Sequence, residues 1–352
     1  MNKKIVITGT HLTPALALMD KLKENSYQLY YLGRNNTFDK ELVTKRGVHF
    51  TAIRTPKLKR HQLLLSTLNA PLLIFSLIKS IKVLVEIKPI TVVSFGGFVA
   101  LPVCLAAKIL RIKLVIHEQT LKAGLTTKLT APLAKTIAIS WPQSQKYFKK
   151  DKTVLTGNLV RKELLKITLT SKLTKTIYIT GGSQGSLVIN QVTTKLLKKI
   201  LKNYRVFHQF GLAQDPLFWQ QALDFKNNLP ENLKKKYTLR QWFSDKELSN
   251  IFSSADLLIS RSGINTVTEA LLLKIRSILI PLPYTQKNEQ LNNANFLKNQ
   301  GLAMVIKQKN LNPDSLLTAI KLSYKTLPKP LFSKTIYPNL SKSTDKLFKL
   351  VK

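Results

Sequence analysis

Short runs of β-branched and other apolar residues alternate along the whole chain with longer stretches in which apolar residues recur at helical spacing. This alternation is typical of a parallel sheet covered by helices. It predicts strands at 4–8, 28–32, 49–53, 91–94, 113–117, 136–139 and 153–156, and again at 176–180, 205–210, 237–240, 256–260, 277–281 and 303–306. At 352 residues the chain is long enough for two domains. We therefore expect an α/β fold of two Rossmann-like domains that face each other across a cleft.

Glycine is scarce in this chain and is concentrated where predicted strands turn into helices. Of the 13 glycines, six fall at three such turns, which contain Gly96-Gly97, Gly181-Gly182-Ser183-Gln184-Gly185 and Gly263. Glycine is needed where the backbone approaches a ligand or adopts positive φ, and a helix start directs free N–H groups at anions. In parallel sheets ligands bind at the carboxyl ends of strands, where all three turns fall. Together the turns indicate phosphate binding.

The third turn carries the most chemistry. The apolar run 255–259 leads into Ser-Arg-Ser-Gly at 260–263 and then into a helix start that reaches Glu269. An ionised carboxylate only accepts hydrogen bonds, so Glu269, about one helical turn beyond the glycine, is placed to bind a sugar diol. A nucleoside diphosphate fits this combination. The alternative is an ordinary strand–helix connection in which the serines and threonines only cap the helix.

The composition narrows the class of protein further. The one cysteine, Cys104, cannot form a disulfide within the chain, which suits a reducing compartment. We see no apolar run of the about 18–20 residues that a membrane span requires, and we expect the protein on the cytosolic side. The net charge is +38, with lysine scattered over the whole length. Without a basic and aromatic cluster, nucleic acid is not the expected partner. A lysine-rich coding bias and attraction to anionic membrane account for the charge better.

Residues 54–88 combine basic and apolar character. The segment contains seven Lys and Arg residues and one acidic residue, Glu86, so its net charge is 7 − 1 = +6. The stretch 63–78 within it is uncharged and mostly apolar. A basic rim around an apolar patch is typical of a surface that lies in a lipid interface. The alternative is a core helix whose lysines are solvated. Pro71 and the length of the segment argue against a membrane span.

Several motifs, in order, resemble the MurG family of glycosyltransferases. They are His11-Leu12-Thr13-Pro14, Gly96-Gly97-Phe98-Val99, His117-Glu118-Gln119 with Ala123-Gly124-Leu125-Thr126, Gly157-Asn158-Leu159-Val160-Arg161, the Gly181–Gly185 segment, Arg261-Ser262-Gly263 through Glu269, and Pro281-Leu282-Pro283-Tyr284 to Asn293-Ala294. The similarity covers nearly the whole chain. Each motif is modest by itself, but the set is specific.

The resemblance implies a GT-B fold and a metal-independent, inverting hexosyltransferase. It would move N-acetylglucosamine from UDP-N-acetylglucosamine to the 4-hydroxyl of undecaprenyl-linked muramoyl-pentapeptide in peptidoglycan synthesis. Residues 1–161 with 332–352 would form an N-terminal domain that binds the acceptor and the membrane, and 162–331 the donor domain. The enzyme would lie at the cytoplasmic face of the cell membrane as a peripheral protein, with no cofactor and no metal.

Matching positions imply roles for individual residues. The donor diphosphate would be held by Ser183, Gln184 and the backbone of Ile264, Asn265, Thr266, Val267 and Thr268. Glu269 would bind the ribose, and Gln290 would contact the donor sugar. Phe243 would lie by the uracil, and Arg161 would contact the nucleotide. Acceptor or phosphate loops would include Thr8, Gly9, Thr10, Gly96, Gly97 and Thr120.

An attacking hydroxyl must lose its proton as it forms the new bond, so a base within hydrogen-bond reach is required. His11 is our first candidate because an imidazole titrates near pH 6.5. Glu118 is the second candidate, as base or as the group that orients the acceptor. The alternative for His11 is a helix-capping or core histidine. The leaving diphosphate would be stabilised by backbone N–H groups, a helix dipole and Arg161.

The chain departs from the family at three places. The family's first loop reads GGTGGH, whereas this chain has Val6-Ile7-Thr8-Gly9-Thr10-His11; Thr120 stands where the family has asparagine, and Glu289 where it has histidine. These changes leave two alternatives to the predicted activity. One is a GT-B transferase that acts on another membrane lipid, and the other is a non-catalytic membrane-associated scaffold. Retention of Ser183, Glu269 and Gln290 argues against the scaffold.

Overall fold

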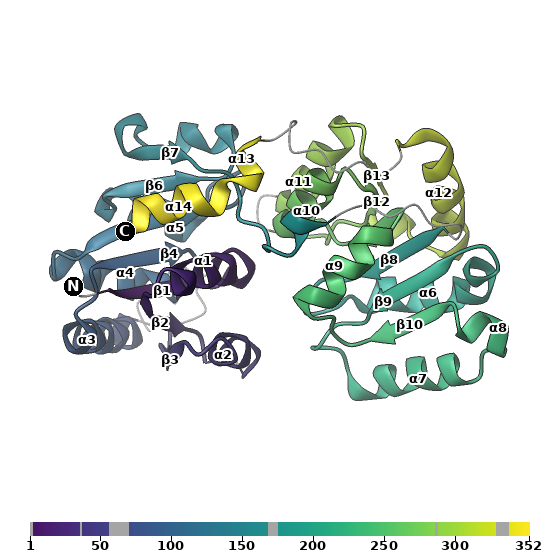
Figure 1. Ribbon diagram of the computed structural model, residues 1–352, viewed down its shortest axis with the longest axis horizontal. Helices are drawn as coiled ribbons and strands as arrows, with labels where there is room; N and C mark the ends of the chain where they lie inside the picture. Colours follow the sequence, from purple (N-terminus) through teal and green to yellow (C-terminus); the bar gives the residue numbers. More distant parts are fainter. Residues whose placement is uncertain (1–2, 36, 56–69, 168–174, 286–287, 329–337) are drawn as a thin grey trace. The chain divides into compact units, whose positions relative to one another are not determined.

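A computed structural model describes residues 3–35, 37–55, 70–167, 175–285, 288–328 and 338–352. The chain divides into two compact units, 1–161 with 338–352 and 162–337. Each unit is a parallel sheet with helices packed on it (Figure 1). Residues 63–69 of the predicted apolar segment lie outside the described residues, and so do residues 168–174, which follow the predicted domain boundary between 161 and 162.

The first unit contains a seven-stranded parallel sheet in the order β3-β2-β1-β4-β5-β6-β7. Its strands are β1 (Lys4–Gly9), β2 (Gln28–Gly33), β3 (His49–Ala52), β4 (Thr91–Phe95), β5 (Lys113–Glu118), β6 (Thr136–Ile139) and β7 (Thr153–Leu155). Its helices are α1 (Leu12–Glu24), α2 (Thr37–Thr44), α3 (Ala70–Ile87), α4 (Ala100–Ile109), α5 (Leu125–Thr130), α13 (Pro338–Ser341) and α14 (Ser343–Val351), with short 3₁₀ turns η2 (Ala131–Leu133), η3 (Pro142–Tyr147) and η4 (Lys150–Lys152).

The second unit contains a six-stranded parallel sheet in the order β10-β9-β8-β11-β12-β13. Its strands are β8 (Thr176–Thr180), β9 (Arg205–Gln209), β10 (Tyr237–Arg240), β11 (Leu257–Ser260), β12 (Arg276–Leu279) and β13 (Ala303–Val305). Its helices are α6 (Leu187–Leu201), α7 (Pro216–Asn227), α8 (Glu231–Lys234), α9 (Asp245–Ser254), α10 (Ile264–Leu273), α11 (Glu289–Asn299) and α12 (Pro313–Thr326), with 3₁₀ turns η5 (Leu164–Lys166) and η7 (Gln308–Asn310).

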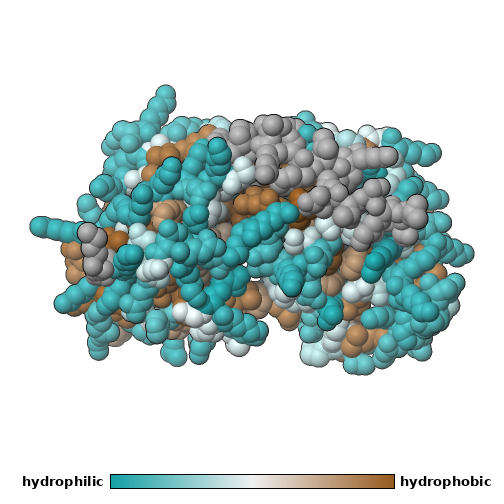
Figure 2. Space-filling model, viewed as in Figure 1, coloured by the Kyte–Doolittle hydropathy of each residue, from teal (hydrophilic) through white to brown (hydrophobic). Residues whose placement is uncertain are grey.

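The prediction of an α/β fold with two Rossmann-like domains is confirmed. All thirteen predicted strands are present, and their ends differ from the prediction by at most two residues. The inner strands are buried on both faces, as helix-covered parallel strands must be, and this is why they appear in the sequence as short continuous apolar runs. Hydrophilic residues are spread over the face that Figure 2 shows, which agrees with lysines distributed along the sequence.

Each sheet has one point at which the strand order reverses. In the first unit β1 and β4 are neighbours, so the chain leaves them toward opposite sides of the sheet, and in the second unit β8 and β11 hold the same position. Ligands of doubly wound sheets bind beside the carboxyl ends of the two strands at such a point. The loops that follow these four strands are therefore the candidate site.

The C-terminal helix α14 packs against the first unit. Leu347 and Val351 are buried in the core beneath α1. Lys21 of α1 forms an ion pair with Asp345, 2.7 Å between Nζ and Oδ1, and the Thr91 hydroxyl donates to the carbonyl of Val351 at 2.8 Å. The apolar face of this helix therefore completes the core of the first unit.

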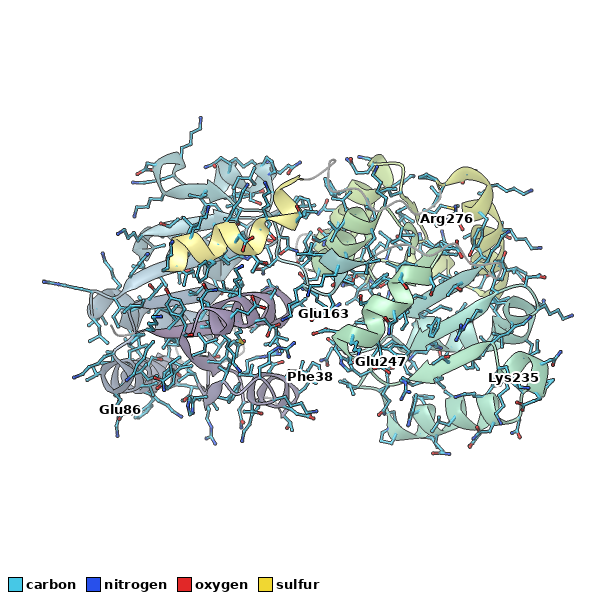
Figure 3. The ribbon with its side chains drawn as sticks, in the orientation of Figure 1. Phe38, Glu86, Glu163, Lys235, Glu247 and Arg276 are labelled. Carbon is cyan, nitrogen blue, oxygen red and sulfur yellow. The ribbon has the colours of Figure 1, made fainter. Side chains whose placement is uncertain are left out.

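In the second unit, Arg276 holds the start of β12 to the region around α12. Its guanidinium lies over the Tyr324 ring, 4.8 Å from the centroid, and its Nε donates to the carbonyl of Pro328 at 3.2 Å (Figure 3). The residue is buried, so its charge is used within the fold. Such a cation–π contact contributes on the order of 1–2 kcal/mol when it is desolvated.

Candidate functional site

The loops after β1 and β4 in the first unit are packed tightly together. The N–H of Thr10 donates to the carbonyl of Gly96 at 3.0 Å. Gly9 has φ +142°, and a Cβ there would stand 2.8 Å from the carbonyl carbon of Phe95, so only glycine fits. Thr8 belongs to β1 itself: it is buried, and its hydroxyl donates to the carbonyl of Leu32 at 2.7 Å. The Thr8 side chain is therefore used within the fold, and its predicted role in a phosphate loop stays a prediction.

His11 is the residue at which α1 begins. It occupies the N-cap position, but its side chain makes no capping hydrogen bond, which removes the helix-capping alternative. Its imidazole Cδ2 is 3.9 Å from the position that a Cβ on Gly96 would take. Burial lowers the pKa of the imidazole; Glu118 opposes this by raising the pKa, and Arg34 lowers it further. A lowered pKa keeps the imidazole neutral at pH 7, which is the state that a general base needs.

Glu118, the other candidate base, holds a loop together. The carboxylate is buried at the end of β5. Oε1 accepts from the Thr120 N–H at 2.9 Å and from the Thr120 hydroxyl at 2.5 Å, and Oε2 accepts from the Gly124 N–H at 3.0 Å. The geometry therefore favours Glu118 as the group that orders residues 118–124 and places a negative charge near His11.

The loop after β8 is held by its glycines. A Cβ on Gly181 would stand 2.2 Å from the N atom of Ser186, and Gly211, which follows β9, lies against Gly185. The carbonyl of Ser183 accepts from the Leu212 N–H at 3.0 Å, and the carbonyl of Gln184 from the Gln214 side chain at 2.8 Å. Gly182, in contrast, has φ +86° and open space where a Cβ would stand. This backbone is pre-formed and open on one side, as an anion-binding turn requires.

The turn after β11 is also open at its glycine. Gly263 is the N-cap of α10, and nothing lies within 4 Å of the position of a Cβ there. The Val267 N–H already donates to the carbonyl of Gly263 at 3.0 Å, and the buried Thr268 hydroxyl donates to the carbonyl of Ile264 at 2.7 Å. Only the first turn of a helix has N–H groups without intrahelical partners. The Val267 N–H and the Thr268 hydroxyl are thus used within the helix, and the role of the Ile264–Thr268 backbone at a diphosphate stays a prediction.

Three further side chains around this turn are fixed by the fold. Glu269 is buried on α10. The Gln290 side-chain carbonyl accepts from the Leu282 N–H at 3.0 Å, and the Gln290 backbone carbonyl accepts from the Ser262 hydroxyl at 2.7 Å. Arg261 donates to the carbonyl of Ile280 at 3.1 Å, and burial lowers the pKa of its guanidinium to about 10. The turn, the β12 end and the start of α11 therefore form one braced group.

Phe243 lies after β10, and its ring is part of the core. It packs edge-on against Tyr178 and Phe207, with ring centroids 6.3 and 6.4 Å apart. Its N–H donates to the side chain of Gln209 at 3.3 Å. Arg161 is the last residue of the segment 1–161 of the first unit, whereas the other predicted donor-binding residues belong to the second unit.

Sequence reasoning missed two residues of the first unit, Arg34 and Asp39. Arg34 follows β2 directly and forms an ion pair with Asp39 of α2, 3.0 Å between Nη2 and Oδ2. The available signal was the position of Arg34 immediately beyond a strand end, where parallel sheets bind ligands. Among the described residues, no group of three or more His, Cys, Asp or Glu side chains is placed to hold a metal ion.

Two Rossmann-like units, with glycine turns at the reversal points of both sheets, define the GT-B class of glycosyltransferases. Models of the glycosyltransferase family 28 N-terminal and C-terminal domains match residues 6–139 and 176–346. The UDP-N-acetylglucosamine--N-acetylmuramyl-(pentapeptide) pyrophosphoryl-undecaprenol N-acetylglucosamine transferase of Clostridium perfringens is 36% identical over 90% of this chain and 89% of its own length. The enzyme of the same name from Lachnoclostridium phytofermentans is 34% identical over 90% of each chain. The chain therefore belongs to glycosyltransferase family 28 and, within it, to the MurG family.

Solved structures agree on the fold. The MurG of Acinetobacter baumannii superposes with a TM-score of 0.68 at 24% identity, covering 99% of both chains. A UDP-GlcNAc 2-epimerase from Neisseria meningitidis, solved with UDP-GlcNAc bound, reaches a TM-score of 0.60 at 16% identity and covers 99% of this chain and 98% of its own. These likenesses support the two-unit architecture.

Proposed function

We propose that the chain is the N-acetylglucosaminyltransferase that converts the lipid-linked muramoyl-pentapeptide into its disaccharide form during peptidoglycan synthesis. The observation that carries this proposal is the 34–36% identity, over about nine tenths of the chain, to enzymes named for that reaction. The pre-formed glycine turns at the ends of β8 and β11 support a nucleoside diphosphate as the donor, and so does Glu269 in the second turn of α10.

For the donor, the second unit supplies backbone N–H groups at a helix start and a buried carboxylate. The first turn of α10 and the loop 181–185 would hold the two phosphates, and Glu269 would accept hydrogen bonds from the ribose diol. Gln290 is braced beside the same turn through Ser262 and Leu282, and it would contact the donor sugar. Arg161 would add positive charge to the leaving diphosphate.

For the acceptor, the first unit supplies His11. The 4-hydroxyl oxygen of the muramoyl sugar forms a bond to the anomeric carbon of N-acetylglucosamine while the bond from that carbon to the UDP oxygen breaks. Attack from the face opposite UDP inverts the configuration. The hydroxyl proton passes to the neutral imidazole of His11, and the negative charge leaves with UDP. Backbone dipoles stabilise that charge, so a metal ion is not required.

The outer face of α3 supports attachment to a membrane surface. Ile74, Phe75 and Ile78 are 57, 69 and 58% exposed, and Val85 lies on the same helical face. The opposite face packs into the core with α4, where Leu84 and Ile87 are buried. Exposed lysines of the same helix and Lys88 at its end surround the apolar residues. A helix with this composition can lie in the interface of an anionic lipid layer.

Within the residues that the structure describes, no helix has the length and apolar content to span a bilayer. The attachment that we propose is peripheral, through α3, at the cytoplasmic face of the membrane.

Calorimetry tests the donor part of this proposal. We expect UDP-N-acetylglucosamine to bind with micromolar affinity, and Glu269→Ala to weaken binding at least tenfold, about 1.4 kcal/mol. Glu247→Ala is the matched control, because Glu247 is an exposed acid that caps α9 in the same unit (Figure 3). Binding that is absent, or that is indifferent to Glu269, would contradict the proposal.

A further inference from the structure

A cavity of about 840 Å³ lies in the first unit at the carboxyl ends of β1–β4. Two guanidinium side chains, Arg34 and Arg54, and three hydroxyl side chains, Thr10, Thr37 and Thr55, belong to its lining. None of the described residues that line it is acidic. Two arginines and several hydroxyls in one cavity without a carboxylate indicate an oxyanion ligand.

Arg34 is held in place by a buried carboxylate. Its Nε and Nη2 donate to the same oxygen of Asp39, Oδ2, at 3.3 and 3.0 Å. The Asp39 side chain is only 7% exposed, whereas that of Arg34 is 47% exposed. Asp39 therefore fixes one edge of the guanidinium, and the half-exposed remainder lies at the cavity. An arginine fixed in this way loses less side-chain freedom when it binds an anion.

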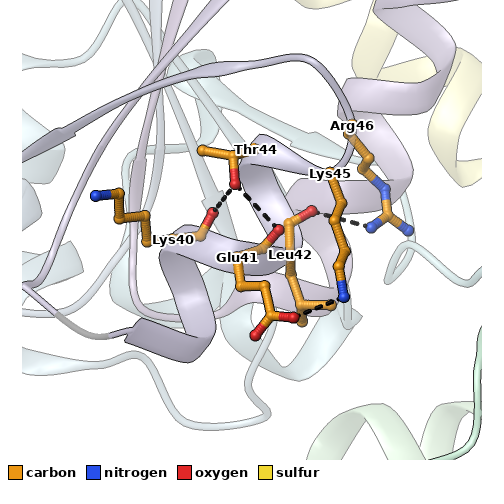
Figure 4. Close-up of polar contacts among 6 residues, drawn as sticks. All are labelled: Lys40, Glu41, Leu42, Thr44, Lys45 and Arg46. Atoms are coloured by element: carbon orange, nitrogen blue, oxygen red, sulfur yellow. Dashed lines mark hydrogen bonds and ion pairs between the residues drawn. The ribbon is translucent and has the colours of Figure 1, made fainter.

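The helix that carries Asp39 is itself anchored. At the end of α2 the Thr44 hydroxyl donates to the carbonyl of Lys40 at 2.9 Å, Lys45 forms an ion pair with Glu41 at 2.6 Å, and Arg46 donates to the carbonyl of Leu42 at 3.2 Å (Figure 4). Arg46 also forms an ion pair with Asp20 of α1, 3.2 Å between Nε and Oδ1. The first three contacts lie within α2 and the turn that follows it, and the Arg46–Asp20 pair attaches this turn to α1.

Arg54 reaches the cavity from the end of β3. Its carbonyl accepts a hydrogen bond from the Ser76 hydroxyl of α3, and Lys79 of α3 donates to the carbonyl of Ala52 at 2.9 Å. The backbone that carries Arg54 is therefore attached to the helix whose outer face we assign to the membrane. Thr10, on the other side of the cavity, directly precedes His11. The cavity is thus lined on one side by a strand end that is attached to the proposed membrane helix, and on the other by the residue that precedes the proposed base.

We propose that Arg34 and Arg54 bind the diphosphate of the lipid-linked acceptor, with Asp39 as the positioning residue for Arg34. The inference rests on the proposed function. A diphosphate joins the lipid to the muramoyl sugar, so a site between α3 and His11 would place the sugar hydroxyl toward the imidazole. Guanidinium groups bind phosphate oxygens bidentately. Here they supply positive charge beside the loop in which Thr10 stands where the family has glycine.

The test is steady-state kinetics with UDP-N-acetylglucosamine and a lipid-linked muramoyl-pentapeptide acceptor in detergent. We expect Arg34→Gln and Arg54→Gln each to raise the acceptor KM about tenfold, equivalent to 1.4 kcal/mol, with the donor KM changed less than twofold. Asp39→Asn retains both arginine charges but releases Arg34, and it should raise the acceptor KM less than Arg34→Gln does. Arg111→Gln is the matched control, because it removes an exposed arginine of the same unit from the turn between α4 and β5, outside the cavity, and it should leave both KM values unchanged.

A second acceptor, identical except that the peptide is absent, distinguishes the diphosphate from a peptide carboxylate. The diphosphate assignment predicts the same rise in KM for both acceptors, and a rise seen only with the peptide present would overturn it. Transfer by the unaltered chain, together with Arg34 and Arg54 variants whose acceptor KM equals that of Arg111→Gln, would overturn the cavity assignment alone. No transfer by the unaltered chain would overturn the proposed function, and with it this inference.

Discussion

The Thr10 hydroxyl occupies the space in which a side chain on Gly97 would stand, with Oγ1 2.2 Å from the ideal Cβ position. Gly97 also has φ +81°, a conformation that disfavours other residues. The loops after β1 and β4 are therefore complementary: a side chain in one requires a glycine in the other. This explains how the chain accommodates Thr10 where the family's first loop has glycine.

Gly97→Ala should consequently lower the free energy of unfolding of the first unit by about 3 kcal/mol, through overpacking and backbone strain. In a Thr10→Gly background the overpacking disappears, and only the strain of about 1 kcal/mol should remain. Urea unfolding of wild type, the two single variants and the double variant measures both values. An equal cost of Gly97→Ala in the two backgrounds would show that the two side chains do not compete for this space.

His11 should control the acid limb of the pH–rate profile. Burial lowers the pKa of its imidazole, so the limb of kcat/KM should lie below pH 6.5, and His11→Ala should reduce kcat by about 10²–10⁴-fold. Arg34 also lowers this pKa, so Arg34→Gln should move the limb to higher pH. The profile of kcat/KM between pH 5 and 8 tests both statements. Persistence of the same limb in His11→Ala would assign the base to another residue.

His208 should make the second unit sensitive to acid. It is fully buried between Tyr237 and Asn190, at 2.9 and 3.1 Å, and burial lowers the pKa of its imidazole to about 3. In the unfolded chain the imidazole takes up a proton below about pH 6.5, which the folded unit does not. Stability is therefore present above pH 6.5 and lost as the pH falls below it, by about 2 kcal/mol between pH 7 and 5.

The urea midpoint of wild type and His208→Gln at pH 7 and pH 5 measures this contribution. Glutamine should cost stability at pH 7, because it replaces a side chain with two hydrogen bonds, but it should reduce the difference between the two pH values. His49→Gln, at an exposed histidine, should leave that difference unchanged. If His208→Gln keeps the full difference, other groups cause the acid sensitivity.

The face of α3 should determine membrane attachment. Phe75→Ser with Ile78→Ser removes two exposed apolar side chains, and because neither lies in the core, stability should change little. Full burial of each in lipid would contribute about 1.5–3 kcal/mol, so binding to vesicles with anionic lipid should fall at least tenfold in sedimentation assays. Leu217→Ser, at an exposed apolar residue of the other unit, is the control. Equal binding by the double variant would exclude α3 as the contact.

The sequence predicted the strands well because both faces of each inner strand are covered. Runs such as Ile5-Val6-Ile7 and Leu257-Leu258-Ile259 are buried in the structure and are apolar throughout, so the pattern itself reports strand position. The glycine turns were also found, since each follows such a run directly. Fold class and loop positions are thus local properties of this sequence.

The pairing of side chains was not predictable in the same way. In the sequence Asp39 is an ordinary acid in a polar helix, and only the fold brings it to Arg34. Glu118 is recognised as the residue that orders its loop only from the hydrogen bonds of Thr120 and Gly124. Equally, only the fold shows that the Thr268 hydroxyl is used within α10, where it donates to the Ile264 carbonyl. These properties depend on tertiary neighbours, which hydrophobic periodicity does not encode.

The most direct measurement of the central claim is transfer of labelled N-acetylglucosamine from its UDP donor to a lipid-linked muramoyl-pentapeptide by the purified chain, without added metal ion. We predict a lipid-linked disaccharide as product, with kcat reduced at least a hundredfold in His11→Ala, and donor use impaired in Glu269→Ala. Absence of the disaccharide under conditions in which UDP-N-acetylglucosamine binds would contradict the account of this chain as the transferase that acts on that acceptor.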